Sequence, residues 1–432
     1  MNNWKKCKLG DVAEITSSKR IFLADYVEGG VPFYRSKEII ERSAGKEISN
    51  PLFISNEKYQ QIVNKFGAPQ YGEMLLTSVG TLGIPYRVSQ TDKFYFKDGN
   101  LTWFRKLKDI SCDYLYYFFL SPIGKEKLET ITIGSTQKAL TIKALQNLDI
   151  SLPSMEEQKR IAGILGSLDD KIELLQKQDK TLEDMAKAIF KSWFVDFDVV
   201  HAKQKGLPKA DIMREYHLTD ELYDLFPSDF ENSSLGPIPL GWQVSPLGHK
   251  CKLLLGGTPA REKKEYWQHG TIAWINSGKV NDFRVATASE YITKEAYDHS
   301  ATKMMPPRTT IIAITGATLG AVSMTEIECC ANQSVVSVLG NQEIPNEYIY
   351  LFVKQNIDVL LSKQTGGAQQ HINKNDISNL EILCPSSKML LAFLQGVKFY
   401  FDKISNNLKQ IQTLTELRDT LLPPLISGKI RV

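Results

Sequence analysis

Two segments of the chain carry apolar residues at the alternating four- and three-residue spacing that is typical of a coiled-coil helix. The first segment, residues 153–190, opens with Pro153 and Ser154, which are common residues at helix starts. Asp179 interrupts its apolar seam. The seam residues are Ile161, Leu165, Leu168, Ile172, Leu175, Leu182, Ala186 and Ile189. This pattern predicts one long helix of roughly 50 Å with an apolar stripe along one side.

The same pattern returns near the end of the chain, where Asp170-Lys171-Ile172 is repeated as Asp402-Lys403-Ile404. The second seam consists of Phe393, Val397, Tyr400, Ile404, Ile411, Leu414 and Leu421. Asn407 and Arg418 occupy seam positions in this copy. Two consecutive prolines, Pro423 and Pro424, predict the end of the second helix. Neither helix can bury its stripe alone, so we expect the two helices to pack against each other. The interrupting Asp179 and Asn407 suggest control of their register.

A globular segment with many turns precedes each helix. Short runs rich in β-branched and aromatic residues predict strands at Val31–Tyr34, Met74–Ser78 and Leu101–Phe104, followed by a helix at Tyr114–Leu120. The second segment repeats this plan at Ile272–Ile275, Thr310–Ile314, Val335–Val338 and Tyr348–Val353. The chain is therefore a duplicated unit of mixed helix and strand.

One local signature is shared by both segments, because Leu75–Gly83 resembles Ile311–Gly320. A strand runs into a glycine turn, which predicts a hairpin whose glycines adopt positive φ. The alternative is a phosphate contact through backbone N–H groups and the hydroxyls of Thr81 and Thr318. In contrast, residues 20–70 have no visible twin in residues 261–307. We expect the two halves of the chain to be similar in their helices and different in their globular segments, so that each globular segment recognises something different.

Composition narrows the range of functions. The chain has 432 residues with 42% hydrophobic and 23% charged residues, as is ordinary for a globular protein. Its net charge of only +3 means that any binding of nucleic acid must come from local patches or from partners. No apolar run approaches the about 18 residues of a membrane span. The cysteines are scattered, which predicts a reducing, cytoplasmic setting: Cys7, Cys112, Cys251, Cys329, Cys330 and Cys384.

Catalytic motifs are missing from the sequence. It contains no phosphate-binding loop, no dinucleotide fingerprint and no paired metal-ligand spacing. Asn50–Phe53 resembles the motif with which amino-methyltransferases hold a flipped base, but a turn that enters a strand explains it better. Glu157–Lys159 and Glu262–Lys264 fit the tail of a nuclease metal site only loosely. A self-sufficient DNA adenine methyltransferase or nuclease remains an alternative, as does a coiled-coil scaffold that binds no DNA.

The remaining chemistry is binding. Arg and Lys can contact guanine edges or phosphates, and Asn and Gln can contact adenine. The candidates in the first segment are Arg20, Arg35, Ser36, Lys37, Thr81, Arg87, Gln137 and Lys138. Those in the second segment are Arg261, Lys263, Lys264, Asn276, Lys279, Arg284, Thr318, Gln369, Gln370 and His371. Tyr34 and Trp274 lie close to them in sequence. Each residue alone is better explained as a solvated surface residue than as a base contact. For the glycine–glutamine turns, a capping or hinge role explains the pattern as well as base contact does.

Five motifs occur in a fixed order along the chain. Trp-x5-Gly opens each segment at Trp4 and Trp242, and a Gly-x-x-Gln turn precedes each helix. Both helices contain Asp-Lys-Ile, and residues 226–239 form a Pro-, Gly- and Ser-rich connector. The chain closes with Leu-Leu-Pro-Pro-Leu-Ile-Ser-Gly-Lys-Ile at residues 421–430. Together these motifs resemble the specificity subunits of type I restriction–modification systems.

This resemblance implies an α+β, α/β-rich fold in which two target recognition domains are separated by two long antiparallel helices. The helices form a coiled-coil spacer within a pseudo-twofold internal repeat. The expected segments are a first recognition domain at 1–151, a spacer helix at 152–194, a linker at 195–235, a second recognition domain at 236–384, and a distal helix and tail at 385–432.

The resemblance also implies a function without catalysis in this chain. Each recognition domain would read one half of a bipartite, asymmetric target in double-stranded DNA. The spacer would set the half-site separation and dock two methyltransferase subunits, through which restriction subunits join. S-adenosylmethionine, ATP and Mg would be bound by those partners, which methylate adenine and cleave DNA. No membrane partner is expected.

Overall fold

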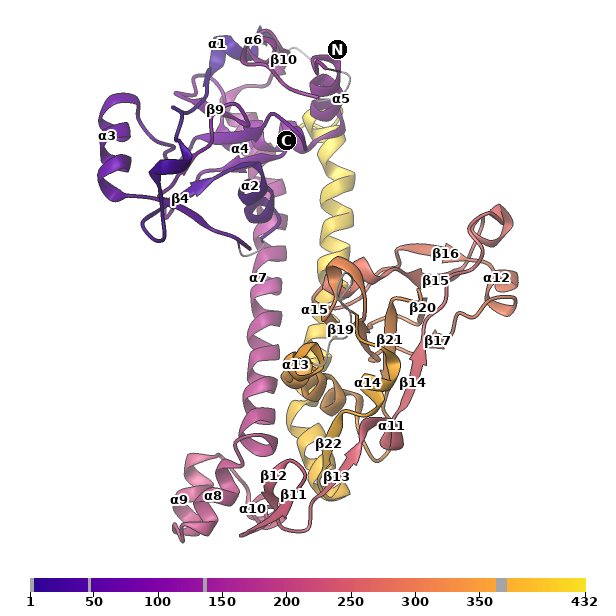
Figure 1. Ribbon diagram of the computed structural model, residues 1–432. Helices are drawn as coiled ribbons and strands as arrows, with labels where there is room; N and C mark the ends of the chain where they lie inside the picture. The colour runs from indigo at the N-terminus through magenta and orange to yellow at the C-terminus, as the bar shows by residue number, and fades with distance from the viewer. Residues whose placement is uncertain (1–3, 46–47, 135–137, 363–370) are drawn as a thin grey trace. The chain divides into compact units, whose positions relative to one another are not determined.

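A computed structural model describes residues 4–45, 48–134, 138–362 and 371–432, and Figure 1 shows its elements. Residues 1–174 and 411–432 belong to a first compact unit, and residues 175–410 form a second. Each unit contains one globular body and part of two long helices, α7 (Met155–Phe194) and α15 (Ser387–Ile426). No described helix has the length and apolarity needed to cross a membrane.

Both long helices begin where the sequence predicts a helix start. The Ser154 hydroxyl accepts a hydrogen bond from the Glu157 N–H at 3.2 Å, and the Ser386 hydroxyl accepts one from the Met389 N–H at 3.2 Å. These bonds satisfy N–H groups that lack a partner within the first turn of a helix. The two helices therefore start in the same way, as expected for a duplicated unit.

Within each unit, apolar seam residues of α7 and of α15 are buried in the same hydrophobic core. In the first unit, Ile161 and Leu165 share a core cluster with Leu422 and Leu425. In the second unit, Phe190 lies 6.1 Å from Phe393 between ring centroids. Predicted seam residues that are fully buried are Ile161, Leu165, Ile172, Leu175, Leu182, Ala186, Phe393, Val397 and Ile404. Half-buried seam residues are Leu168, Ile189, Tyr400, Ile411, Leu414 and Leu421.

The polar interruptions of the seam are paired. In the second unit, Asn407 donates to the Asp179 carboxylate at 2.7 Å, and both residues are buried. Since Asp179 contacts Asn407 while Phe190 contacts Phe393, the numbering of α15 falls as that of α7 rises. The helices are therefore antiparallel there. In the first unit, Arg418 donates to Asp169 at 2.8 Å.

The second helix does not end at its prolines, so that prediction was wrong. Helix α15 continues through Pro423 and Pro424 to Ile426. The prolines lack the N–H groups that would bond the carbonyls of residues 419 and 420, but these residues are exposed and water can replace the missing donors. Leu425 and Ile426 are buried in the core of the first unit, which stabilises this last turn.

Each body consists of a two-stranded ribbon and two four-stranded sheets. The first body has the ribbon β1-β10 and the sheets β2-β9-β6-β7 and β3-β5-β4-β8. The strands are β1 (Lys5–Lys8), β2 (Glu14–Thr16), β3 (Tyr26–Val27), β4 (Val31–Tyr34), β5 (Leu52–Ile54), β6 (Met74–Thr77), β7 (Pro85–Arg87), β8 (Tyr95–Phe96), β9 (Leu101–Arg105) and β10 (Asp149–Leu152). The helices are α1 (Leu9–Val12), α2 (Ser36–Ser43), α3 (Asn56–Phe66), α4 (Cys112–Leu120), α5 (Pro122–Thr130) and α6 (Ile142–Gln146).

The second body has the ribbon β13-β22 and the sheets β14-β21-β18-β19 and β16-β15-β20-β17. The strands are β13 (Gln243–Pro246), β14 (Lys252–Leu255), β15 (Ile272–Ile275), β16 (Glu290–Ile292), β17 (Met304–Met305), β18 (Thr310–Ala313), β19 (Val322–Met324), β20 (Cys329–Ala331), β21 (Val335–Leu339) and β22 (Glu381–Cys384). The helices are α11 (Leu247–Lys250), α12 (Lys294–Asp298), α13 (Asn346–Ser362) and α14 (Lys374–Ser378). The predicted strands and helices of both segments are thus confirmed.

The expectation that residues 20–70 have no twin was wrong at the level of topology. Strand β4 pairs in parallel with β8 and antiparallel with β5, and β15 pairs in the same way with β20 and β16. Only the fourth strand differs, since β3 extends the sheet beside β5 whereas β17 extends it beside β20. The sequence hides this likeness because short strands tolerate many apolar side chains.

The connector after α7 is folded. It contains the helices α8 (Asp198–Gln204), α9 (Lys209–Glu215) and α10 (Asp220–Leu225) and the hairpin β11 (Phe230–Ser233)–β12 (Gly236–Pro239). Val199, Ile212, Phe226 and Ile238 are buried in the main core of the second unit. The aromatic residues of the linker predicted from composition at 195–235 therefore fix it to that core.

Replacing Asp179 by asparagine is expected to stabilise the chain above pH 6. Burial, opposed by the hydrogen bond from Asn407 and the charge of Arg284, raises the pKa of Asp179 to about 6. The unfolded value is about 3.9, so the folded chain binds more protons between these values and its stability falls as the pH rises through them. Asp179→Asn keeps the acceptor for Asn407 and removes the charge. Denaturant unfolding should show a gain of up to about 3 kcal/mol at pH 8.

The gain from Asp179→Asn should shrink towards zero near pH 4, because the wild-type carboxyl is then protonated. The exposed Asp170 on the same helix provides the control, and Asp170→Asn should leave this pH profile unchanged. An equal gain at pH 4 and pH 8 would contradict the assignment.

Candidate nucleic-acid interface

The shared glycine signature forms a hairpin in both bodies. Gly80 and Gly83 have φ of 79° and 78° between β6 and β7, and Gly316 and Gly320 have φ of 70° and 82° between β18 and β19. A side chain at these positive φ angles would strain the backbone. The hairpin interpretation is therefore confirmed, and contact of the Thr81 and Thr318 hydroxyls with a phosphate stays a prediction.

The turn before each long helix pairs with this glycine hairpin. In the first body, the Leu140 N–H donates to the Ser78 carbonyl at 2.9 Å. In the second body, the Ile372 N–H donates to the Ile314 carbonyl at 3.0 Å, and Thr315 forms a bridge with His371. Two signatures that are distant in sequence thus form one surface, and they do so by the same backbone contacts in both bodies.

Three further loops join this surface. The Ser78 N–H donates to the Asn100 carbonyl at 2.8 Å, and the Ser36 hydroxyl donates to the same carbonyl at 3.3 Å. The Ser17 hydroxyl donates to the Leu101 carbonyl at 3.2 Å. In the second body, the Ile314 N–H donates to the Ser334 carbonyl in the same way, and backbone bonds from Asn332 to Ile275 and from Gly256 to Val335 take the place of the two hydroxyl bonds. We call this set of loops the loop edge: residues 17–20, 35–37, 78–83, 98–100 and 138–140 in the first body, and 256–261, 276–279, 314–320, 332–334 and 371–372 in the second.

Most of the predicted binding residues lie at the loop edge. In the first body these are Arg20, Arg35, Ser36, Lys37, Thr81 and Lys138. In the second body these are Arg261, Asn276, Lys279, Thr318 and His371, with Lys263 and Lys264 directly following. Gln137, Gln369 and Gln370 lie outside the described residues. The sequence candidates thus gather on one surface of each body, although nothing in the sequence pattern alone places them together.

Many cations of the loop edge already have a carboxylate partner. Arg20 pairs with Asp98 at 2.9 Å, Lys279 pairs with Asp282 at 3.0 Å, and Arg35 pairs with Glu38. Arg261 binds both Glu290 oxygens at 2.7 and 2.8 Å and stacks 3.6 Å above the Trp267 ring. This bidentate bond lowers the pKa of Glu290. A phosphate or base that contacts these arginines must therefore replace or share an internal acceptor.

The aromatic residues beside the predicted contacts are buried. Tyr34 stacks on Phe94 with 4.6 Å between ring centroids. Trp274 donates its indole N–H to the Gly257 carbonyl at 3.1 Å. Both rings therefore hold the strand core together, and they are not positioned to stack on bases.

Arg87 lies away from the loop edge, on β7 facing helix α4. Its guanidinium pairs with Asp113 at 2.8 Å and stacks 4.3 Å from the Tyr116 ring. These contacts fix a strand to a helix. The role in DNA binding expected for Arg87 is not supported by its position.

Arg284 was wrongly predicted to face DNA, because its side chain is fully buried in the second unit. It donates to Glu183 of α7 at 3.0 Å and to the Tyr350 hydroxyl of α13 at 2.6 Å. Lys354 adds a contact to Glu183 at 3.2 Å. Burial alone would raise the pKa of Glu183, but the charges of Arg284 and Lys354 lower it to about 2. This network fixes the second body to helix α7.

Two lysines near the loop edge were missed by the sequence analysis. Lys19 and Lys65 are exposed, and neither has an ion pair with any described carboxylate. They are far apart in sequence, so their approach to a shared cavity depends on the fold. Within the described ranges, no group of three or more His, Cys, Asp or Glu residues is arranged to hold a metal ion.

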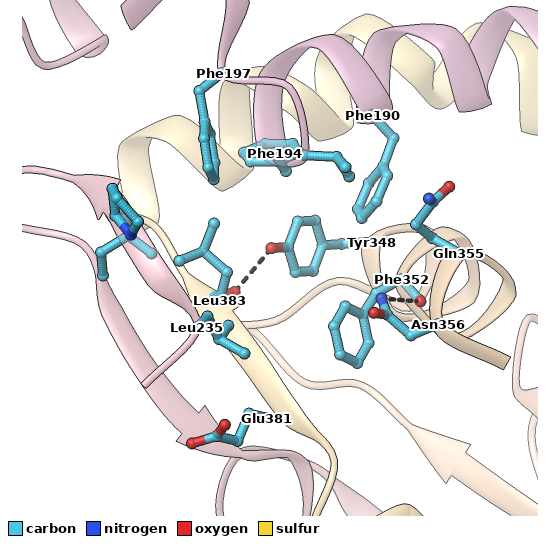
Figure 2. A pocket seen from close by; sticks show the side chains of 13 residues that line it. Phe190, Phe194, Phe197, Leu235, Tyr348, Phe352, Gln355, Asn356, Glu381 and Leu383 are labelled. Atoms are coloured by element: carbon cyan, nitrogen blue, oxygen red, sulfur yellow. Dashed lines mark hydrogen bonds between the residues drawn. The ribbon is translucent and has the colours of Figure 1, made fainter. Parts of the chain in front are cut away.

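A cavity lies beside the connector, in the second unit (Figure 2). It is a cavity of about 270 Å³ whose walls are mainly apolar, half aromatic and half aliphatic, with two amides and one carboxylate among its lining. The lining includes Phe190, Phe194, Phe197, Tyr348, Phe352, Gln355, Asn356 and Glu381. The Tyr348 hydroxyl donates to the Leu383 carbonyl at 2.8 Å, which satisfies the only polar atom of the aromatic wall.

The fold and sequence of the chain are similar to those of known proteins. The family described as "Type I restriction modification DNA specificity domain" matches residues 1–184 and 239–415. The HindI specificity subunit of Haemophilus influenzae is 25% identical over the full length of both chains. The MjaIX specificity subunit of Methanocaldococcus jannaschii is 27% identical over all of this chain and 94% of the relative. A solved S subunit from M. genitalium shares the fold, with a TM-score of 0.54 and 16% identity over 98% of this chain and 96% of the other.

Arg284→Met is expected to destabilise the chain without acting on DNA directly. It leaves the Glu183 carboxylate buried without its main partner, so the free energy of unfolding should fall by about 3–5 kcal/mol. The double variant with Glu183→Met should recover much of this loss, because no buried charge is then left unpaired. Denaturant unfolding of the single and double variants measures both effects.

Arg261→Met is the matched control, since Arg261 is exposed at the loop edge and its loss should change stability by about 1 kcal/mol or less. A variant Arg284→Met of unchanged stability but reduced DNA affinity would show that Arg284 reaches DNA after all.

Proposed function

The chain belongs to the type I restriction–modification DNA specificity family, and from this membership we propose that its two bodies each read one half of a bipartite, asymmetric sequence in double-stranded DNA. The loop edge is the surface that we assign to DNA in each body. One observation carries the proposal: two backbone bonds of this edge, Leu140 to Ser78 and Ser78 to Asn100, recur as Ile372 to Ile314 and Ile314 to Ser334, while the side chains on the edge differ.

The side chains of the two loop edges support unlike half-sites. After β4 the first body presents Arg35 and Ser36, and after β15 the second body presents Asn276 and Ser277. Ala139 is bridged to Val79 of the first glycine hairpin, whereas His371 is bridged to Thr315 of the second. Direct readout depends on the donors and acceptors that a side chain offers to base edges. A common frame with different donors and acceptors therefore suits two different half-sites.

The long helices are proposed to set the separation of the half-sites. Each unit contains an antiparallel portion of the α7–α15 pair, so the helices are shared by both units. The length of a helix grows by about 1.5 Å for each residue. We infer that the number of residues between the two bodies along these helices determines the gap in the target.

The chemistry of the complex is proposed to lie in other subunits. Two methyltransferase subunits would supply S-adenosylmethionine and methylate adenine, and restriction subunits joined through them would use ATP and Mg to move and cleave DNA. The rival motif, Asn50–Phe53, is a turn that enters β5. This agrees with its interpretation as a structural turn.

The methyltransferase subunits are proposed to dock on exposed apolar residues of the helix pair and the connector. In the second unit, Phe399 and Leu391 of α15 are 67% and 56% exposed, and Met185 of α7 is 45% exposed. Large apolar side chains at this exposure are typical of surfaces that bind another protein. The aromatic cavity beside the connector offers a further recess for an apolar side chain of the same partner (Figure 2).

Exchanging residues 1–150 for those of another family member tests the assignment of the bodies. The expected result is a new sequence in one half of the methylated target and no change in the other half, because each body reads its half-site alone. Sequencing of methylated adenines in a genome that carries the hybrid measures this. Changes in both halves, or in neither, would rule out modular reading.

A methyl-transfer assay on the purified chain, without partner subunits, provides the control for catalysis. The purified chain with labelled S-adenosylmethionine and DNA should transfer no methyl group. Methyl transfer by the chain alone would establish the self-sufficient methyltransferase instead.

Phe399→Ser is expected to weaken assembly with the methyltransferase subunits by roughly tenfold, since an aromatic side chain is lost from the contact. The unfolding midpoint should stay constant because Phe399 is mostly exposed. Gln395→Ser, at an exposed polar position of the same helix, is the matched control. Equal affinity of both variants, measured by titration calorimetry, would exclude this surface.

A further inference from the structure

A basic cavity lies beside the loop edge of the first body. Its volume is about 250 Å³, and its lining consists of Thr16, Ser17, Lys19, Lys65, Phe66, Tyr95, Trp103 and Arg105. Trp103 and Tyr95 are buried and form part of its wall. Three cationic residues and three hydroxyl-bearing residues therefore line one recess, and no carboxylate belongs to its lining.

The fold holds the walls of this cavity in place. The Lys19 N–H donates to the Tyr95 hydroxyl at 2.8 Å. Arg105 donates to the Phe66 carbonyl at 3.1 Å, at the end of helix α3, and stacks 4.7 Å from the Trp103 ring. The next residue, Gly67, has φ of 81°, which lets the chain turn away. Contacts within the protein therefore hold the walls of the cavity in place without a ligand.

The two lysines of the cavity differ from the arginines of the loop edge. Arg20, Arg35 and Arg261 each pair with an internal carboxylate. In the cavity, Arg105 pairs with Glu14, which also pairs with Lys106. Lys19 lies 4.8 Å from the Phe66 ring, and no described carboxylate pairs with Lys19 or with Lys65. Two ammonium groups thus lack a counter-charge in the part of the chain that the structure describes.

The cavity is continuous with the loop edge through Ser17. The Ser17 hydroxyl accepts a hydrogen bond from the Gly99 N–H at 3.3 Å and donates one to the Leu101 carbonyl. Arg20 and Asp98 pair in the same two loops. A DNA strand that follows the loop edge would therefore reach the cavity.

We propose that this cavity binds a backbone phosphate of the DNA strand that lies along the first loop edge, with Lys19 and Lys65 as its cationic ligands. This rests on the proposed function. A phosphate oxygen accepts hydrogen bonds from ammonium groups, and such a contact positions the duplex without reading its sequence. Arg105 is a positioning residue, since it holds Phe66 and Glu14.

In the second body, Gly256 bonds to Val335 as Ser17 bonds to Leu101, so Thr258 stands at the position that matches Lys19. Its loop after β14 carries Arg261, which is stacked on Trp267 and bonded to Glu290. The phosphate site is therefore assigned to one half of the target only, and it predicts an asymmetry in backbone contacts between the halves.

Lys19→Ala and Lys65→Ala test the site in the full chain assembled with its methyltransferase subunits. Each variant should lower affinity for a target duplex roughly fivefold near 0.1 M salt and flatten the slope of log K against log salt by about one. The methylated sequence should stay the same. Lys65→Arg should restore the slope, and Lys143→Ala, at an exposed lysine of α6, is the matched control.

Methylphosphonate substitution at single positions of the duplex locates the contact. At one position, the methylphosphonate should weaken DNA binding by the wild type and leave binding by the Lys19→Ala variant unchanged. A changed methylated sequence in the variants would mean base readout and overturn the proposal. Unchanged affinity and slope would also overturn it, and calorimetric binding of inorganic phosphate in that case would identify a free-anion site. The exchange of residues 1–150 tests the proposed function separately, so failure of one can be told from failure of the other.

Discussion

Each long helix carries an apolar stripe that it cannot bury alone, and the rest of the structure depends on how that stripe is covered. Burial of a large apolar side chain stabilises a fold by about 1.5–3 kcal/mol, so a seam of this length is a major source of stability. Within each unit the cover comes from the other helix together with one body. In the second unit, Phe190 and Phe393 meet the Tyr348 ring in one aromatic cluster.

Buried polar contacts add specificity to this apolar seam. Asp179 and Asn407 leave two oxygen atoms without a hydrogen-bond partner in the described structure, so this pair weakens the seam while restricting its register. Arg284 and Glu183 then fix the second body to α7, and in the first unit Tyr117 donates to Asp169 at 2.7 Å in a comparable position between body and helix. The bodies are thus joined to the helices by directional bonds as well as by apolar burial.

A duplicated frame with divergent surfaces explains how one chain can serve two half-sites. The bonds that recur in both loop edges join backbone groups and do not depend on side-chain identity, so many side chains of the edge are free to vary without loss of the fold. Carboxylate partners such as Asp98 and Glu290 hold arginines in fixed positions, which limits nonspecific attraction to DNA in a chain of net charge +3.

The sequence by itself determined the helix pair, the repeat and the main strands, because spacing along the chain directly reports which face of an element is apolar. It also identified most residues of the loop edge by type. Tertiary structure decided the rest. Arg284 and Arg20 look alike in sequence, yet one is buried against Glu183 and the other is exposed beside Asp98. Lys19 and Lys65 share a cavity only because α3 returns to the sheet. Burial and charge pairing depend on contacts between distant residues, and local pattern carries no information about those contacts.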